Sequence, residues 1–262
     1  MKSLLAPQNR PVLCRLGRDR VLLAFDFDGT LAPIVADPAR AHLRPRTRRL
    51  LTEVARKYPC VVISGRNRAD VVRRVSGIPL RRVFGNHGIE PSPALPAARR
   101  AVRRWLACLK PRLEGVAGIV FDDKGASLAI HYRKSRNRST ALKAILTATA
   151  DLREARVLQG LLVVDLLPKG APNKATSLQL EMRRLHCDSA LYLGDDKTDE
   201  DVFALSQRLP LVAVRVGRKA RSLAPYYLAS QADVDALLMK LVELSDLRAA
   251  SLDRVTSTGV HS

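Results

Sequence analysis

Short apolar runs that alternate with helix-like stretches characterise the first part of this chain. Three of the runs predict strands, at Val21–Phe25, Cys60–Ser64 and Arg82–Phe84. Helical patterns at Thr47–Lys57 and Arg68–Val75 lie between them. Strands that alternate with helices in this way are typical of a doubly wound parallel sheet. We therefore predict an α/β, Rossmann-like core.

The pattern changes after a proline-rich break at Pro91–Pro96. The next segment predicts helix, strand, strand, twice over: a helix through about Lys110, strands at Gly118–Asp122 and Ser127–Tyr132, a helix at Thr140–Leu152, and strands at Arg156–Gln159 and Leu161–Leu167. This order indicates an α+β unit (αββαββ) with an antiparallel sheet, inserted into the core as a lid.

The alternating pattern resumes after a second break at Pro168–Pro172. It predicts helices at Lys174–Arg184, Glu200–Leu205 and Val234–Leu244, and strands at Ala190–Leu193, Leu211–Val216 and Tyr226–Leu228. The last dozen residues, rich in serine and threonine, are expected to fray. We therefore predict a core formed by residues 1–92 and 168–262 and a cap formed by residues 93–167.

Composition and charge narrow the class of protein only slightly. The hydrophobic content of 47% is enough for a sizeable core, and the formal net charge is +20. Of the 45 basic residues, 34 are arginine, and they are spread along most of the chain. A nucleic-acid-binding module, the alternative from a different class, would cluster this charge and interleave aromatic side chains, which make up only 4% here. We expect solvated basic faces or arginine-rich codon usage, and no nucleic-acid partner.

Four cysteines lack the spacing of a metal or redox motif, which favours a reduced, cytoplasmic protein; they are Cys14, Cys60, Cys108 and Cys187. The first residues lack an apolar segment of signal-peptide length, and no run approaches transmembrane length. We expect a monomer without a membrane partner.

Two acidic stretches each follow an apolar run that indicates a buried strand: Asp26–Leu31 (DFDGTL) and Gly194–Asp201 (GDDKTDED). Ligands bind outside the carboxyl ends of parallel strands, so both stretches are expected to face one crevice. Asp26 and Asp28 begin on the same side of the extended chain, and Gly29 permits a tight turn. Massed carboxylates repel one another unless a cation joins them, and hard oxygen ligands suit Mg²⁺.

The two acidic stretches resemble motifs I and IV of the haloacid dehalogenase superfamily. Between them, Val61–Ser64 is an apolar strand that ends in a hydroxyl, as motif II does, and Lys174 opens a helix, as the motif III lysine does. The family pattern around that lysine usually reads Asn-Lys-Gly, whereas this chain has Asn173-Lys-Ala175. Lys169, which precedes a glycine in the second break, is the alternative motif III lysine.

The resemblance implies a phosphatase that works through an aspartyl-phosphate. Asp26 would be the nucleophile, and Asp28 would protonate the leaving oxygen and then activate water. Ser64 and Lys174 would bind the phosphoryl oxygens, while Asp199 would tether ligands or bound water. The implied Mg²⁺ ligands are Asp26, Asp28 (through its backbone carbonyl) and Asp195.

A second set of motifs resembles the trehalose-6-phosphate phosphatases over roughly residues 20–245. The motifs are Ser64–Arg66 (SGR), Gly85–Glu90 (GNHGIE), Asp122–Arg133 (DDKGASLAIHYR) and Gly194–Glu200. This resemblance implies hydrolysis of trehalose 6-phosphate to trehalose and phosphate, the last step of trehalose biosynthesis. The implied substrate-binding residues are Arg66, Asn86, His87, Glu90 and Asn173 of the core and Lys124, His131 and Arg133 of the cap.

Several alternatives stay open at this point. The segment His131–Arg133 fits an ordinary cap strand, with Tyr132 packed inward, as well as it fits a binding strand. A related phosphatase could act on sucrose phosphate or on mannosyl- or glucosyl-phosphoglycerate. A phosphomutase would share the aspartate pair, and the residues alone do not separate it from a phosphatase.

Overall fold

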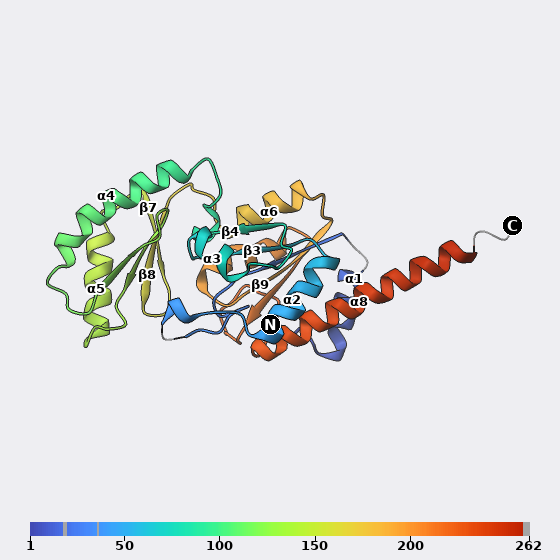
Figure 1. The fold of residues 1–262 in the computed structure, drawn as a ribbon. Helices are drawn as coiled ribbons and strands as arrows, with labels where there is room; N and C mark the ends of the chain where they lie inside the picture. Colours follow the sequence, from blue (N-terminus) through green and yellow to red (C-terminus); the bar gives the residue numbers. More distant parts are fainter. Residues whose placement is uncertain (18–19, 36, 259–262) are drawn as a thin grey trace.

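Two lobes, each built around one sheet, form the molecule (Figure 1). This computed structural model describes residues 1–17, 20–35 and 37–258, with side chains described as far as residue 250. One lobe holds a parallel sheet and both ends of the described chain, and the other holds an antiparallel sheet. The elements of the second lobe run consecutively in sequence between β4 (Arg82–Phe84) and α6 (Lys174–Arg184).

The larger sheet contains seven strands within the described residues, all paired in parallel. Their order across the sheet is β1 (Lys2–Ser3), β11 (Tyr226–Leu228), β10 (Leu211–Val216), β9 (Ser189–Gly194), β2 (Val21–Phe25), β3 (Cys60–Ile63) and β4. The two strands that carry the acidic motifs, β2 and β9, are therefore neighbours. Their register pairs Phe25 with Leu193, which brings the two acidic stretches to the same edge.

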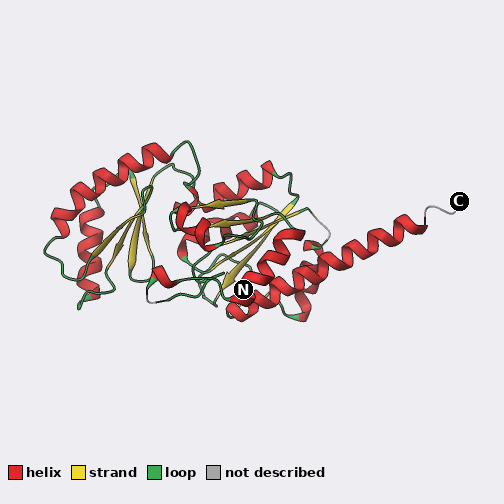
Figure 2. Ribbon diagram, in the orientation of Figure 1, coloured by secondary structure: helices red, strands yellow, loops and turns green. Residues whose placement is uncertain are grey.

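Helices cover both faces of this sheet, as expected for a doubly wound fold (Figure 2). One face packs against α1 (Arg10–Leu16), α2 (Pro45–Lys57), α3 (Arg68–Arg74) and α8 (Gln231–Thr258). The other face packs against α6 and α7 (Glu200–Phe203). A sheet that is buried on both faces requires continuous apolar strands, and all five residues of β2 are buried.

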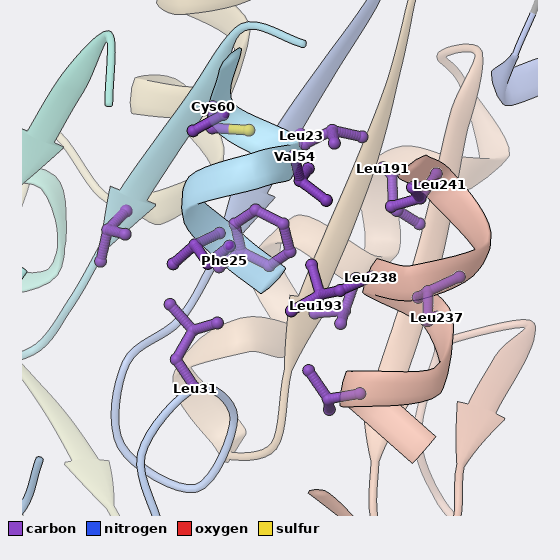
Figure 3. Packing of buried hydrophobic residues seen from close by; sticks show 14 of the residues in the cluster. Leu23, Phe25, Leu31, Val54, Cys60, Leu191, Leu193, Leu237, Leu238 and Leu241 are labelled. Atoms are coloured by element: carbon purple, nitrogen blue, oxygen red, sulfur yellow. The ribbon is translucent and has the colours of Figure 1, made fainter. Parts of the chain in front are cut away.

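Alternate residues of β2 enter the two halves of the core. Leu23 and Phe25 lie with Val54 of α2 and with leucines of α8 (Figure 3). Leu22 and Ala24 face α6 and α7. Burying one leucine-sized side chain contributes roughly 1.5–3 kcal/mol. This packing fixes the strand, and with it the position of Asp26 immediately after Phe25.

The smaller sheet contains four antiparallel strands within the described residues: β5 (Val120–Asp123), β6 (Leu128–His131), β8 (Val163–Pro168) and β7 (Ala155–Gln159). Helices α4 (Leu95–Leu113) and α5 (Arg138–Thr149) pack on one face of it, around the buried Trp105. The predicted α/β core and the αββαββ order of the inserted segment are therefore both observed.

Several elements differ from the prediction. Helix α8 continues past the expected end at Leu244 to Thr258, because its sequence has neither glycine nor proline to stop it. The expected fraying of the tail therefore does not apply as far as Thr258, and residues 259–262 lie outside the described part. The short elements β1 and α1 were not predicted, since so few residues show no hydrophobic period.

The predicted helix Glu200–Leu205 is divided into α7 and a 3₁₀ turn at Ala204–Gln207.

All four cysteines are free thiols. Among the helices of the described chain, none combines the length and the apolar content that crossing a membrane requires.

Candidate active site

A cavity of about 550 Å³ lies between the two sheets. This volume falls in the range of small-molecule sites, roughly 300–1,000 Å³. Both lobes contribute to its wall. Nine of the sequence-predicted site residues line it: Asp26, Asp28, Arg66, His87, Lys124, His131, Arg133, Lys174 and Asp195.

The centre of the site is a buried lysine among aspartates. Lys174 Nζ lies 3.1 Å from Asp26 Oδ1 and 2.7 Å from Asp199 Oδ1. Asp26, Asp195 and Asp199 each place a carboxylate oxygen within 4.8 Å of the others. Of the two candidate lysines, Lys174 is the one at this centre, whereas Lys169 is exposed in the turn after β8.

Local sequence explains how these groups converge. Asp26 follows β2, and its backbone N–H donates to Leu193 O of β9 at 2.8 Å. Gly29 has a φ of +79°, and a Cβ atom there would overlap the Asp195 carboxylate. Lys174 begins α6 beside Asn173, whose side chain accepts from the N–H of Thr176 and caps the helix.

The electrostatics of this centre show an excess of negative charge. Burial, with the charges of Asp199, Asp195 and Asp28, raises the pKa of Asp26 well above its usual range, although Lys174 opposes the shift. Burial and Asp199 raise the pKa of Asp195 to about 7. Burial alone would lower the pKa of Lys174, but Asp199 and Asp26 outweigh it and raise that pKa.

A divalent cation fits this set of groups. Three carboxylates and one ammonium carry a formal excess of two negative charges, and carboxylate oxygens are the ligands of hard cations. Asp199 differs from the other two, since both of its oxygens already accept protein donors: Lys174 and Tyr192 on Oδ1, and the backbone N–H groups of Asp195 and Asp196 on Oδ2. Asp26 and Asp195 are therefore the better placed side-chain ligands.

Asp28 lies apart from the acidic cluster. Its carboxylate accepts two hydrogen bonds from Arg66, from Nε to Oδ2 and from Nη2 to Oδ1, both at 2.7 Å. Arg66 also donates to Asp70 at 2.9 Å and to the carbonyl of Pro38 at 2.8 Å. A bidentate guanidinium pair fixes both position and orientation, so Asp28 is held at the cavity wall by a residue that lines it too.

His87 lies in the cavity wall with two unsatisfied ring nitrogens. Its side chain is 6% exposed, and both Nδ1 and Nε2 are buried with no protein partner among the described residues. Burial, together with the charges of Lys124, Lys174 and Arg156, lowers the pKa of His87 well below its usual range. The neutral ring thus carries one donor and one acceptor that no described protein group pairs.

The cap contributes two close pairs of polar side chains to the cavity. Lys124 Nζ lies 3.5 Å from Asp165 Oδ1, and His131 Nε2 lies 3.7 Å from Asp122 Oδ2. Arg133, just after β6, is exposed and lines the same wall. This arrangement gives the cap several directed donors and acceptors of the kind that bind sugar hydroxyls.

Five predicted site residues fall outside the cavity lining of the described chain, and Asp199 of the central cluster is one of them. Asn86 instead joins the lobes: its Nδ2 donates to Lys124 O at 3.0 Å, and its Oδ1 accepts from Ser127 Oγ at 2.6 Å. Glu90 accepts from the backbone N–H of Arg68 at 2.7 Å, at the start of α3.

Ser64 and Asn173 are the other two. Ser64 is fully buried, and its Oγ accepts from the backbone N–H of Arg66 at 3.2 Å. Asn173 caps α6 and donates from Nδ2 to Asp201 at 3.3 Å. These side chains therefore hold the elements of the site, and motif resemblance did not distinguish this from ligand contact.

The structure also adds residues that sequence reasoning missed. Asp122 and Asp165 line the cavity from the cap strands, and Arg215 and Lys219 line it from the core. A signal existed for Asp122, since it ends the predicted strand Gly118–Asp122 and lies two residues before Lys124. Asp201, in the first turn of α7, forms an ion pair with Arg156 of the cap.

The fold and the site together define a protein of the haloacid dehalogenase type, with an aspartate at the end of a central parallel strand and an inserted α+β cap. A family model described as trehalose-phosphatase matches residues 24–232, and the chain belongs to that family. Membership implies a divalent metal.

Individual relatives agree with this assignment. The trehalose-phosphate phosphatase of Mycobacterium tuberculosis (strain H37Rv) is 37% identical over 194 residues, which are 68% of this chain and 49% of the relative. The chain thus spans about half the length of the curated relatives it matches. The C-terminal domain of C. albicans trehalose-6-phosphate phosphatase has the same fold (TM-score 0.74, 24% identity, covering 90% of this chain and 98% of that one). The Aspergillus fumigatus enzyme (crystal form 3) matches with a TM-score of 0.63 and 25% identity over 93% and 99% of the two chains.

Proposed function

We propose that this protein hydrolyses trehalose 6-phosphate to trehalose and phosphate in the presence of Mg²⁺. One observation supports this most directly: Asp26, paired with the buried Lys174, faces a cavity that the cap closes with polar side chains. Family membership supports the substrate, since the relatives are named trehalose-phosphate phosphatases.

In this proposal Asp26 is the nucleophile. One of its carboxylate oxygens forms a bond to phosphorus as the bond from phosphorus to the O6 atom of the sugar breaks, which leaves an aspartyl-phosphate. Lys174 holds the Asp26 carboxylate in place and offers positive charge to the phosphoryl oxygens. Asp26, the backbone carbonyl of Asp28 and Asp195 would hold Mg²⁺, which would supply charge that neutralises the carboxylates and the phosphoryl group.

Asp28 is the proposed general acid and base. It gives a proton to the departing sugar oxygen and then takes one from the water that attacks the aspartyl-phosphate. Arg66 sets the orientation of the Asp28 carboxylate and must share it with the leaving group during the reaction. Water attack at phosphorus releases inorganic phosphate and regenerates the Asp26 carboxylate.

Recognition of the sugar is the proposed task of the cavity wall. His87 contributes from the core, since its two ring nitrogens lack protein partners in the described structure. Lys124, His131 and Arg133 contribute from the cap. Contacts to the distal glucose would then hold the cap over the phosphate and keep bulk water out.

The remaining parts of the proposal concern the molecule as a whole. Residues 1–92 and 168–262 form the core in this proposal, and residues 93–167 form the cap, which agrees with the positions of α4 and β8. We also propose a cytoplasmic monomer that binds a small phosphosugar.

The test is phosphate release from a panel of phosphosugars, each with Mg²⁺ and with EDTA. We expect trehalose 6-phosphate to give the highest kcat/KM, with activity lost in EDTA and restored by excess Mg²⁺. A higher kcat/KM for sucrose phosphate or a glycosyl-phosphoglycerate would show that the proposed substrate is wrong, whereas the proposed mechanism would still apply. Full turnover in metal-free buffer would rule out the mechanism.

A further inference from the structure

The hydroxyl group of Tyr192 is a polar group in the centre of the core that the proposed mechanism does not use. Tyr192 lies on β9, between Leu191 and Leu193, and is fully buried. Its position faces the helix layer formed by α6 and α7, where its ring makes an edge contact with Phe203 at 6.0 Å between centroids. A phenyl ring would fill the same space, so packing explains the ring but not the hydroxyl.

The hydroxyl reaches the underside of the catalytic centre. It donates to Asp199 Oδ1 at 2.6 Å, the same oxygen that accepts from Lys174 at 2.7 Å. The other oxygen of Asp199 accepts the backbone N–H groups of Asp195 and Asp196, both at 2.9 Å. Asp199 is fully buried, and all four of these donors come from the protein.

This arrangement connects the tyrosine to two groups of the reaction. Through Oδ1 of Asp199 it shares an acceptor with Lys174, which also contacts Asp26. By fixing the orientation of the Asp199 carboxylate, Tyr192 also restrains the backbone N–H groups of Asp195 and Asp196 that bind Oδ2. Burial and the charge of Asp199 raise the pKa of the Tyr192 phenol, so the hydroxyl stays a donor.

Removing the hydroxyl has a predictable effect on the charges. Asp199 Oδ1 would then depend on Lys174 alone for its charge compensation, which draws the lysine towards Asp199 and away from Asp26. The carboxylate would also lose the contact that fixes its rotation, and the loop at Asp195 would be held less firmly. Both changes act where the phosphoryl group is transferred, far from the sugar contacts of the cap.

We propose that Tyr192 is a positioning residue, which sets Lys174 and Asp195 for phosphoryl transfer through its hydrogen bond to Asp199. This inference rests on the proposed function and adds a residue to its machinery.

The test is Tyr192→Phe, with Tyr58→Phe as the matched control. The Tyr58 hydroxyl is also buried and donates to the carbonyl of Leu241 at 3.1 Å, away from the cavity. We expect Tyr192→Phe to lower kcat for trehalose 6-phosphate at least ~10-fold with KM within about twofold, because the lost contacts act in the transition state. Tyr58→Phe should keep both constants within about twofold of the wild type, although each variant loses one buried hydrogen bond worth roughly 1 kcal/mol of stability.

A second measurement does not require turnover. Calorimetric titration with Mg²⁺ should give a dissociation constant at least ~3-fold higher for Tyr192→Phe than for the wild type, and an unchanged constant for Tyr58→Phe. Unfolding temperatures of all three proteins are measured first, and kinetics are run well below the lowest. If Tyr192→Phe is too unstable at the temperature of the wild-type assay, both measurements are made on all three proteins at a lower temperature, because one lost hydrogen bond costs only roughly 1 kcal/mol.

The outcomes separate the two proposals. If the wild type hydrolyses none of the phosphosugars, the proposed function fails, while the Mg²⁺ titration still tests the positioning role. If the wild type is active and Tyr192→Phe retains its kcat and its Mg²⁺ affinity, the positioning role is wrong. Equal losses of kcat and Mg²⁺ affinity in Tyr192→Phe and Tyr58→Phe would also overturn it, because they would show that the loss follows from lower stability alone.

Discussion

Asp26 is the residue at which a small substitution should abolish catalysis and leave the fold intact. Replacing its carboxylate by an amide, in Asp26→Asn, keeps the shape but leaves no oxygen able to attack phosphorus. We expect phosphate release to fall by at least ~10³-fold. Because burial and neighbouring carboxylates disfavour the charged form of Asp26, the unfolding temperature of the variant without Mg²⁺ should be no lower than that of the wild type.

Two measurements check this prediction: a phosphate-release assay with Mg²⁺ and a thermal unfolding scan in EDTA. Inhibition of the wild type by beryllium fluoride, which mimics an aspartyl-phosphate, is the companion experiment. Substantial turnover by the folded Asn variant would remove Asp26 from the role of nucleophile.

His87 makes stability depend on pH in a direction that follows from its burial. The folded protein holds the ring neutral, so below its ordinary pKa of 6.5 the unfolded chain binds the proton more readily. The neutral His87 therefore makes its full contribution to the free energy of unfolding above pH 6.5. This contribution decreases as the pH falls towards the lower pKa of the folded state, by up to about 1.4 kcal/mol per pH unit.

The comparison variant is His87→Asn, because asparagine tolerates the positive φ of 58° at this position. Urea unfolding of both proteins is followed across the acidic range, so that the contributions of shared carboxylates cancel in the difference. The stability of the wild type should decrease relative to the variant as the pH falls below 6.5. Parallel curves for the two proteins would show that His87 is not held neutral.

At the scale of elements, the strands of the cap are expected to govern specificity rather than chemistry. Arg133 follows β6, lines the cavity and lies far in sequence from the acidic motifs. Arg133→Ala should lower kcat/KM for trehalose 6-phosphate at least ~10-fold, the loss of a charge-assisted contact of about 1.4 kcal/mol. The variant should barely change turnover of p-nitrophenyl phosphate, which has no second sugar. Equal losses on both substrates would assign Arg133 to folding or to the core.

The contact between β7 and α7 gives a second prediction at this scale. Arg156 of the cap forms two hydrogen bonds with Asp201 of the core, at 2.5 and 2.7 Å, and Asp201 also accepts from Asn173 beside Lys174. Both side chains are partly exposed, which limits the contribution of the pair to stability. We expect it to act mainly on how the cap sits over the cavity.

A double-mutant cycle on kcat/KM tests this role, with Arg156→Ala, Asp201→Ala and the double variant. Each single change should lower kcat/KM for trehalose 6-phosphate ~3- to 10-fold, and the double variant should lose less than the product of the two. Arg104→Ala, which breaks the exposed pair with Glu154 inside the cap, is the control and should have little effect. Losses that simply multiply would show that the two residues act independently.

At the scale of the whole molecule, the sequence predicted what depends on long apolar runs and missed what depends on single polar contacts. The strand Val21–Phe25 was predicted at its observed bounds, because burial on both faces leaves no polar residue in it. The assignment of Asn86 and Glu90 to substrate stays a prediction from the motif, whereas their hydrogen bonds between elements are seen only in the structure, because nothing local in a sequence shows them. Tyr192 offered a signal that was not used: a hydroxyl in an apolar strand needs a partner.

The strand order has a consequence for how the protein is made. β2 lies inside the sheet, between β9 and β3, but β9 is encoded after the entire cap segment. A ribosome therefore releases β2, β3 and β4, and then a cap able to collapse on its own side chains, while one edge of β2 still has no strand beside it. Unpaired apolar edges of this kind attract other chains, so the nascent protein needs shielding during that interval. Asp26, which follows β2, meets the lysine and acids of the later segments only after the cap segment has been made.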